Sequence, residues 1–297
     1  MERAELPTPP ARFRVGIVGA GRVGSVLGAA LARAGHSVVA VSAVSEASRE
    51  RAARLLPGVP IRDIPDVLTA SDLVVFAVPD DALIPLVHGL AETDHFGYGQ
   101  LVAHTSGRHG LAPLWPAADR GCVPLALHPA MTFTGGGGDL DRLADCAFGV
   151  TAPEMWRPVA EALVIELGAD PVWIADADRV AYHAALAHGA NHLVTLIAQS
   201  SEILRGAGVA APDRVLRPRV EAALDNALRG GDAALTGPVS RGDAGTVEAH
   251  LTELSTAAPD ILMAYRALAL ATAQRAVASG RLRPDLALPV VELLEDR

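Results

Sequence analysis

Residues 13–24, FRVGIVGAGRVG, limit the possible folds of this chain more than any other stretch. A short apolar run leads into three glycines, and an amphipathic segment over 26–34 follows them. In a strand, turn and helix of this kind, Gly19 permits the tight turn, Gly21 lets a ligand approach the backbone, and Gly24 lets the helix lie close to the strand. The free N–H groups at such a helix start bind phosphate. The predicted dinucleotide contacts are Gly19, Ala20, Gly21, Arg22, Val23 and Gly24. The alternative is a tight turn that binds nothing.

The first half of the chain alternates between short apolar runs and helical patterns, which is typical of a parallel sheet covered by helices. The expected strands are 13–18, 37–42, 73–78, 101–104, 122–127, 146–151 and 171–174. Only long Ala- and Leu-rich segments punctuated by glycines remain after these strands, and they predict helices. Those helices are expected over 176–206, 212–229, 243–256, 259–279 and 284–295. The sequence therefore predicts an α/β domain with a doubly wound parallel sheet at 13–175, an all-helical domain at 176–297, and a disordered tail at 1–12.

Charge and composition exclude several classes of protein. The formal charge of −9 argues against nucleic acid as the main partner. The apolar stretch at about 180–200 is interrupted by three histidines and an asparagine, which favours a buried helix over a membrane span. Residues 1–12 lack the apolar core of a secretory signal, and Cys122 and Cys146 are expected as buried free thiols. We therefore expect a cytoplasmic protein.

The end of the second expected strand favours one dinucleotide over the other. NAD-binding domains place an acidic residue there, where it bonds to the adenosine ribose. In this chain that position is Ser42, and the first acid is Glu46. Ser42, Arg49 and Arg22 could instead bind a 2′-phosphate, so NADP is favoured, with NAD less favoured and a flavin or deazaflavin as the remaining alternative. The two arginines could also be solvated surface charges.

Polar residues follow three of the expected strands, at the sheet edge where ligands of α/β proteins bind. One strand runs into Val78, Pro79 and Asp80, where the chain is expected to pass the central ribose of the cofactor. Ser106 and His128 follow the next two strands, which would bring them together. A histidine can move a hydroxyl proton in either direction near neutral pH while a nicotinamide exchanges hydride, and a serine can orient the carbonyl. The alternatives are a histidine that bonds a loop backbone and a serine that makes an ordinary turn.

The first expected helix of the second domain carries further polar candidates. His183, Ala187 and Asn191 follow one another at intervals of four, so they share a helix face. Unpaired buried polar groups are costly, and a face turned toward the cofactor would explain both His183 and Asn191. Bonds to neighbouring helices are the alternative. His188 and His192 have the spacing of a metal-binding pair, but no third ligand stands at a diagnostic spacing, so no metal is expected.

The segment 235–243, LTGPVSRGD, joins two of the expected helices. Its hydroxyls, its glycines and Arg241 predict an anion-binding turn before a helix that begins near Asp243. We therefore expect Thr236 and Arg241 to contact the substrate. The alternative is a capped loop between helices, in which Asp243 is the N-cap and Arg241 is solvated.

Six motifs, in their order and spacing, resemble a bacterial family of Rossmann-like proteins with a C-terminal domain of unknown function, number 2520. They are GIVGAGRVG, AVPDDAL, HTSG, LHPAMTF, YHAALAHGANHLVTL and ALTGPVSRGD, and they span about 13–280. The family belongs with 6-phosphogluconate dehydrogenase, ketopantoate reductase, pyrroline-5-carboxylate reductase and prephenate dehydrogenase. The resemblance implies an N-terminal NAD(P)-binding domain, a helical domain like the C-terminal one of 6-phosphogluconate dehydrogenase, an active site between the two, and a homodimer formed through the helical domain.

The resemblance also implies roles for individual residues. Ser106 and His128, followed by glycine and proline, are similar to the serine and the His-Pro motif of prephenate dehydrogenases, in which the histidine assists removal of the hydroxyl proton. Asn191 matches the asparagine of the Lys-x-x-x-Asn motif of ketopantoate reductases and hydroxyisobutyrate-type dehydrogenases. The lysine position is occupied by Ala187, and His183, one turn earlier, is the expected replacement.

Together these features predict an NADP-dependent oxidoreductase that exchanges hydride with a small, anionic oxo or hydroxy substrate such as a 2-oxo acid. His128 or His183 would move the proton, and Ser106 and Asn191 would orient the substrate. The alternative is a non-catalytic dinucleotide sensor or partner-binding protein that uses the same fold. A narrower enzymatic alternative is an activity like that of ketopantoate reductase.

Overall fold

The computed structural model describes residues 12–295, so the tail expected at 1–12 lies, apart from Arg12, outside the described residues. The chain divides into two compact units, one that ends at Ala187 and one that begins at His188. Each unit is described by itself below. None of the helices over 12–295 is long and apolar enough to cross a membrane.

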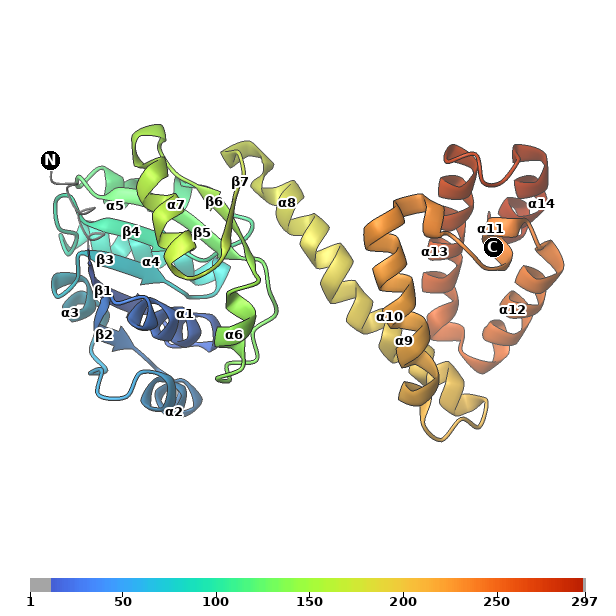
Figure 1. The fold of residues 1–297 in the computed structure, drawn as a ribbon, viewed down its shortest axis with the longest axis horizontal. Coiled ribbons are helices and arrows are strands. Elements are labelled where there is room, and N and C mark those ends of the chain that lie inside the picture. The colour runs from blue at the N-terminus through green and yellow to red at the C-terminus, as the bar shows by residue number, and fades with distance from the viewer. Residues whose placement is uncertain (1–11, 296–297) are drawn as a thin grey trace, which may run out of the picture. The chain divides into compact units, whose positions relative to one another are not determined.

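The first unit is built on a seven-stranded sheet in the order β2-β1-β3-β4-β5-β6-β7 (Figure 1). Its strands are β1 (Arg14–Val18), β2 (Ser37–Ser42), β3 (Leu73–Phe76), β4 (Leu101–His104), β5 (Val123–Pro129), β6 (Ala147–Thr151) and β7 (Asp170–Trp173). All neighbours run parallel except β5 and β6, which pair antiparallel, so the expectation of a wholly parallel sheet is wrong at this one place. Parallel neighbours need a long crossover, usually a full helix, and the β5–β6 connection carries only a five-residue helix.

Helices cover both faces of this sheet and define two separate cores. They are α1 (Arg22–Arg33), α2 (Glu46–Leu55), α3 (Ile64–Thr69), α4 (Asp80–Glu92), α5 (Trp115–Ala118), α6 (Asp139–Leu143) and α7 (Arg157–Glu166). Successive residues of β3 alternate between the cores: Leu73 and Val75 belong to one, and Val74 and Phe76 to the other. A continuous apolar strand buried on both faces is what the sequence of β3 predicts, and the doubly wound α/β fold is confirmed.

The register of the strands aligns their carboxyl ends along one edge of the sheet. Val18 pairs with Ser42 on one side and with Phe76 on the other. Phe76 in turn pairs with His104, and His104 with Ala126. The segments that follow these residues therefore emerge at the same edge, which is where the sequence places the polar candidates.

Helix α8 (Arg179–Leu186) follows the sheet and is the last α-helix described in the first unit. A π-helix over Ala187–Asn191 comes next. The sequence places the domain boundary after residue 175, whereas the compact unit extends to Ala187, since α8 is bonded to the sheet through Arg179 and Tyr182. The single helix expected over 176–206 is thus two α-helices joined by a π-turn.

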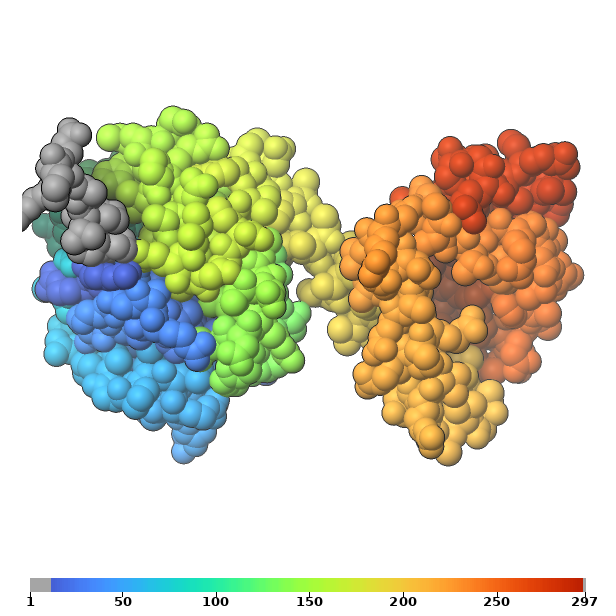
Figure 2. Space-filling model, viewed as in Figure 1, coloured from blue at the N-terminus to red at the C-terminus, as the bar shows by residue number. Residues whose placement is uncertain are grey.

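The second unit consists of helices, as the sequence predicts. They are α9 (His192–Gly206), α10 (Pro212–Gly230), α11 (Pro238–Arg241), α12 (Ala244–Ala257), α13 (Pro259–Ala278) and α14 (Pro284–Glu295). Val247, Leu251, Ala273 and Val290 form the centre of its core, where α12, α13 and α14 meet. The space-filling view shows that the surface of this unit is hollowed between α9 and α13 (Figure 2).

Candidate functional site

The glycine turn after β1 has the geometry of a phosphate-binding turn. Gly19 has φ +96°, a conformation that L side chains rarely adopt. A Cβ at Gly24 would collide with the carbonyl oxygen of Gly19, so α1 can start this close to β1 only with glycine there. No side chain caps the start of α1. The start of α1 therefore presents backbone N–H groups to a ligand at the carboxyl edge of the sheet.

Ser42 shapes this turn from the end of β2. Its hydroxyl oxygen accepts a hydrogen bond of 3.0 Å from the Gly19 N–H, and its carbonyl accepts one of 2.8 Å from the Ala20 N–H. The residue is only 7% exposed. Ser42 thus holds the turn in place through these two bonds. Arg22 and Arg49 are exposed.

The segment after β3 begins helix α4. Val78 and Pro79 lead into Asp80, whose carboxylate accepts a hydrogen bond of 2.9 Å from the Arg108 guanidinium. A second bond of 3.2 Å joins Arg108 to Asp81. These ion pairs tie the chain after β3 to the chain after β4, so the two loops lie together at the sheet edge.

His104 and Ser106 form a buried turn at the end of β4. His104 is fully buried; its Nε2 bonds to the Gly110 carbonyl at 2.7 Å, and its Nδ1 accepts from the Ser106 N–H at 3.2 Å. Burial lowers the pKa of His104 to about 4, so the ring is neutral at pH 7. The Ser106 hydroxyl oxygen accepts a bond of 3.3 Å from the His109 N–H, which leaves its O–H free to donate. His104 is a structural support for the Ser106 turn.

His128 and His183 converge on the bare Cα of Gly107. A Cβ there would lie 2.6 Å from Cδ2 of His183 and 2.9 Å from Nε2 of His128. Nδ1 of His128 bonds to the Tyr182 hydroxyl at 2.9 Å, and the His128 and His183 rings stand edge to face with centroids 6.1 Å apart. The structure therefore brings together Ser106, His128 and His183, which the sequence proposes from strand ends and helix spacing.

Arg179, which sequence reasoning missed, lies directly beneath this group. Its side chain is fully buried and donates to the Thr151 hydroxyl at 2.8 Å and to the carbonyls of Ala126 at 2.9 Å, Gly149 at 3.0 Å and Ser106 at 3.4 Å. Among the residues that the structure describes, no carboxylate forms an ion pair with it. In the sequence Arg179 follows two aspartates and has the pattern of a solvated helix start, so no local signal marks it as buried.

Burial lowers the pKa of His128 to about 4, and the positive charge of Arg179 acts in the same direction. His128 is therefore a neutral imidazole at pH 7, with one nitrogen bonded to Tyr182 and the other facing Gly107. A neutral ring in that position can donate one proton and accept another in a single relay.

The remaining candidates belong to the second unit. Asn191 is exposed at the end of the π-helix, and the interval of four that would align it with His183 does not hold across a π-turn. His188 and His192 approach with their Nδ1 atoms 3.1 Å apart, but the described part of the chain contains no group of three His, Cys, Asp or Glu side chains that could hold a metal.

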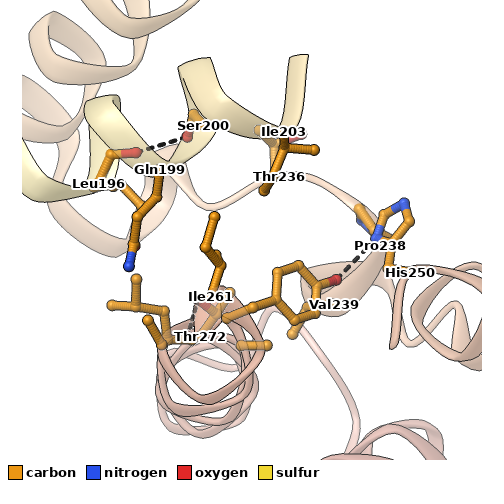
Figure 3. Close-up of a pocket in the computed structure, with 14 residues that line it drawn as sticks. Leu196, Gln199, Ser200, Ile203, Thr236, Pro238, Val239, His250, Ile261 and Thr272 are labelled. Carbon is orange, nitrogen blue, oxygen red and sulfur yellow. Dashed lines mark hydrogen bonds between the residues drawn. The ribbon is translucent and has the colours of Figure 1, made fainter. Parts of the chain in front are cut away.

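The segment 235–243 has the features of the capped loop, which is the alternative drawn from the sequence. Asp243 accepts a bond of 3.1 Å from the Thr246 N–H and so caps α12, as in a structural loop. Thr236 lines a cavity of about 350 Å³ between α9 and α13, together with Pro238 and Val239 (Figure 3). The cavity wall is mostly apolar, with a His250–Tyr265 hydrogen bond of 2.8 Å on one side. Arg241 is exposed and does not line it.

Comparison with known proteins agrees with this fold. Residues 3–129 match the Rossmann-like domain, and residues 146–272 match the domain of unknown function 2520. No curated protein matches the chain.

Solved structures share the fold at low sequence identity. A candidate NADP oxidoreductase from Bacteroides fragilis has a TM-score of 0.73 at 20% identity, over 89% of this chain and 98% of that one. A 1-pyrroline-5-carboxylate reductase from Streptococcus pyogenes has a TM-score of 0.59 at 15% identity, over 91% and 98%. A reductive aminase from Aspergillus terreus, solved with NADPH and ethyl levulinate, has a TM-score of 0.58 at 18% identity, over 96% and 93%.

Proposed function

We propose that this chain, which belongs to the family that joins a Rossmann-like domain to the domain of unknown function 2520, is an NADP-dependent oxidoreductase that acts on a small, anionic oxo or hydroxy compound. The observation that carries the proposal is the pairing of His128 with Tyr182 beside Gly107, at the same sheet edge as the open glycine turn. A turn that binds nothing would not need a neutral histidine with one free nitrogen at that edge.

The chain fits a bound dinucleotide. The uncapped start of α1 and the glycines at 19 and 24 would hold its pyrophosphate, and the missing acid at the end of β2 favours a 2′-phosphate over a free ribose. One protein of this fold is named as an NADP oxidoreductase, and another was solved with NADPH bound, which supports NADP over NAD. When bound, the nicotinamide supplies or removes the hydride.

The proton is moved by His128 and Tyr182. With the Tyr182 O–H donating to Nδ1, the ring carries its proton on Nε2, which faces Gly107. A substrate oxygen at that place takes the Nε2 proton as its negative charge develops, and Nδ1 takes the proton of Tyr182. The half-buried Tyr182 phenolate that is left lies near the Arg179 charge and regains its proton from water. In the oxidative direction both protons move the other way. The free O–H of Ser106 can orient the same oxygen.

The charge below the site supports the proposal of an anionic substrate. Arg179 is buried without a described carboxylate partner, and its positive field favours an anionic group or a developing oxyanion near His128. Compounds with a C=N bond are a further class to test, because two proteins of the fold are named as a pyrroline-carboxylate reductase and a reductive aminase.

A substrate panel tests this proposal. We expect NADPH oxidation with 2-oxo acids, ketopantoate or cyclic imino acids, and at least about tenfold lower kcat/KM for the methyl ester of the best substrate, since a lost charge-assisted contact costs about 1.4 kcal/mol or more. Equal turnover of acid and ester would contradict an anionic substrate. Tight NADPH binding without turnover of any member would indicate a dinucleotide sensor instead.

A further inference from the structure

Arginines without acidic partners gather beside the glycine turn. The chain carries a net charge of −9, and several arginines elsewhere in the first unit pair with carboxylates, as Arg14 does with Asp72 at 2.7 Å and Arg120 with Asp94 at 2.8 Å. Within residues 12–295, no ion pair involves any of the arginines around the turn and on α2. These are Arg22, Arg49, Arg51 and Arg54. Glu46 and Glu50 are on the same helix and are exposed. Arginines that form no ion pair therefore gather where an anion would bind.

A second glycine-rich segment, 134–138, packs against these arginines, although it is distant from them in the sequence. Its anchor is Asp139, which is fully buried and accepts from the N–H groups of Thr134 at 2.8 Å and Gly135 at 2.7 Å. Arg54 donates to the Gly135 carbonyl at 2.8 Å, and Arg51 reaches the Ala20 carbonyl of the first glycine turn at 3.5 Å. The segment thus holds Arg54 of α2 and lies beside Arg51, which contacts the dinucleotide turn.

The place of these arginines along a bound dinucleotide indicates which of its phosphate groups they would contact. In this fold the pyrophosphate lies at the start of α1 and the adenosine ribose lies at the end of β2, next to α2. The Ser42 hydroxyl oxygen accepts from Gly19 and the residue is only 7% exposed, so Ser42 can offer a phosphate at most one neutral O–H, and charged contacts must come from arginines. Arg51 and Arg54 are three residues apart and share a face of α2, whereas Arg49 is turned about 200° from Arg51. Guanidinium groups bind phosphate through two parallel N–H bonds.

We infer that Arg51 and Arg54, and not Arg49, bind the 2′-phosphate of the cofactor, and that Gly135 positions them. The inference rests on the proposed function and names the residues that set its preference for NADP. It replaces Arg49, one of the residues expected from the sequence, with two arginines whose contacts with Ala20 and Gly135 only the structure reveals.

The test compares binding of NADPH, NADH and 2′,5′-ADP by three variants. Arg51→Ala and Arg54→Ala are each expected to weaken NADPH and 2′,5′-ADP about 10- to 100-fold, as a charge-assisted phosphate contact predicts, and to change NADH less than about twofold. Arg49→Ala is the matched control and should bind all three like the parent. Equal weakening of NADPH and NADH would assign the arginines to the pyrophosphate, and loss confined to Arg49→Ala would restore the original residue; both overturn the inference. A parent chain that binds neither nucleotide would contradict the proposed function itself.

Two glycine variants test the role of the segment. A Cβ at Gly135 would lie 2.6 Å from Nε of Arg51 and 3.1 Å from Cγ of Arg22, at a residue with φ +78°. Gly135→Ala should therefore weaken NADPH at least about fivefold and leave NADH unchanged. Gly137→Ala is the control, because its Cβ would meet nothing within 4 Å. NADPH binding that is unaltered in Gly135→Ala, with thermal unfolding like the parent's, would show that the segment does not position the arginines.

Discussion

Replacing Arg179 with methionine is expected to lower the free energy of unfolding of the first unit by about 3–5 kcal/mol. The substitution leaves the carbonyls of Ala126 and Gly149 and the Thr151 hydroxyl buried without their donor. These groups belong to β5 and β6, so the loss weakens the one antiparallel pair of the sheet as well as the docking of α8. Urea unfolding followed by tryptophan fluorescence measures this unit alone, since all three tryptophans, at 115, 156 and 173, lie in it.

A second arginine provides the control for that measurement. Arg120 forms an exposed ion pair with Asp94, and exposed pairs contribute little because water and salt screen them. Arg120→Met should therefore cost less than about 1 kcal/mol. If Arg179→Met were as mild as the control, Arg179 would not be the group that joins the two strands and α8.

His128→Ala is expected to lower kcat roughly 100- to 10,000-fold, which is the usual contribution of a positioned proton donor or acceptor. The NADPH dissociation constant should stay within about twofold of the parent's, because His128 acts on the substrate oxygen and not on the cofactor phosphates. Tyr182→Phe keeps the ring but removes the hydroxyl bonded to Nδ1, so it should retain more activity than His128→Ala. Full turnover in His128→Ala would contradict the assigned role.

The pH dependence of the parent enzyme follows from the same residue. The neutral form of His128 is the active one, and its pKa is lowered to about 4, so acid inactivates the enzyme only as pH falls toward that value. The kcat/KM profile should thus be flat from pH 8 to about 5.5 and fall below it. A half-maximal point near about 6.5, the pKa of an unperturbed histidine, would show that the site is open to water or that another histidine moves the proton.

Much of the fold is contained in local sequence patterns. The alternation of apolar runs and helical segments predicts all seven strands to within a few residues, and glycine punctuation predicts the helices of the second unit. The direction of β6 could not be predicted, since the sequence shows that 146–151 is a strand but not which way it crosses β5. The π-turn at 187–191 could not be predicted either, because the sequence pattern around it is helical throughout.

The candidate site was predictable only where topology decides position. Ser106 and His128 follow neighbouring strands, so they had to emerge together. The direction of a side chain is a different matter: nothing in the sequence shows that Ser42 turns toward Gly19, that Arg179 is buried, or that Arg51 and not Arg49 reaches the turn. Substrate contact by Thr236, Arg241 and Asn191, and the expected homodimer, stay predictions.

The central claim is that the chain binds NADPH and prefers it to NADH. Equilibrium titration of the unmodified protein with both nucleotides, followed by nicotinamide fluorescence, measures this most directly. We predict that NADPH binds at least about tenfold more tightly than NADH, a difference of about 1.4 kcal/mol. Equal affinity for the two, or no binding of either, would contradict the account.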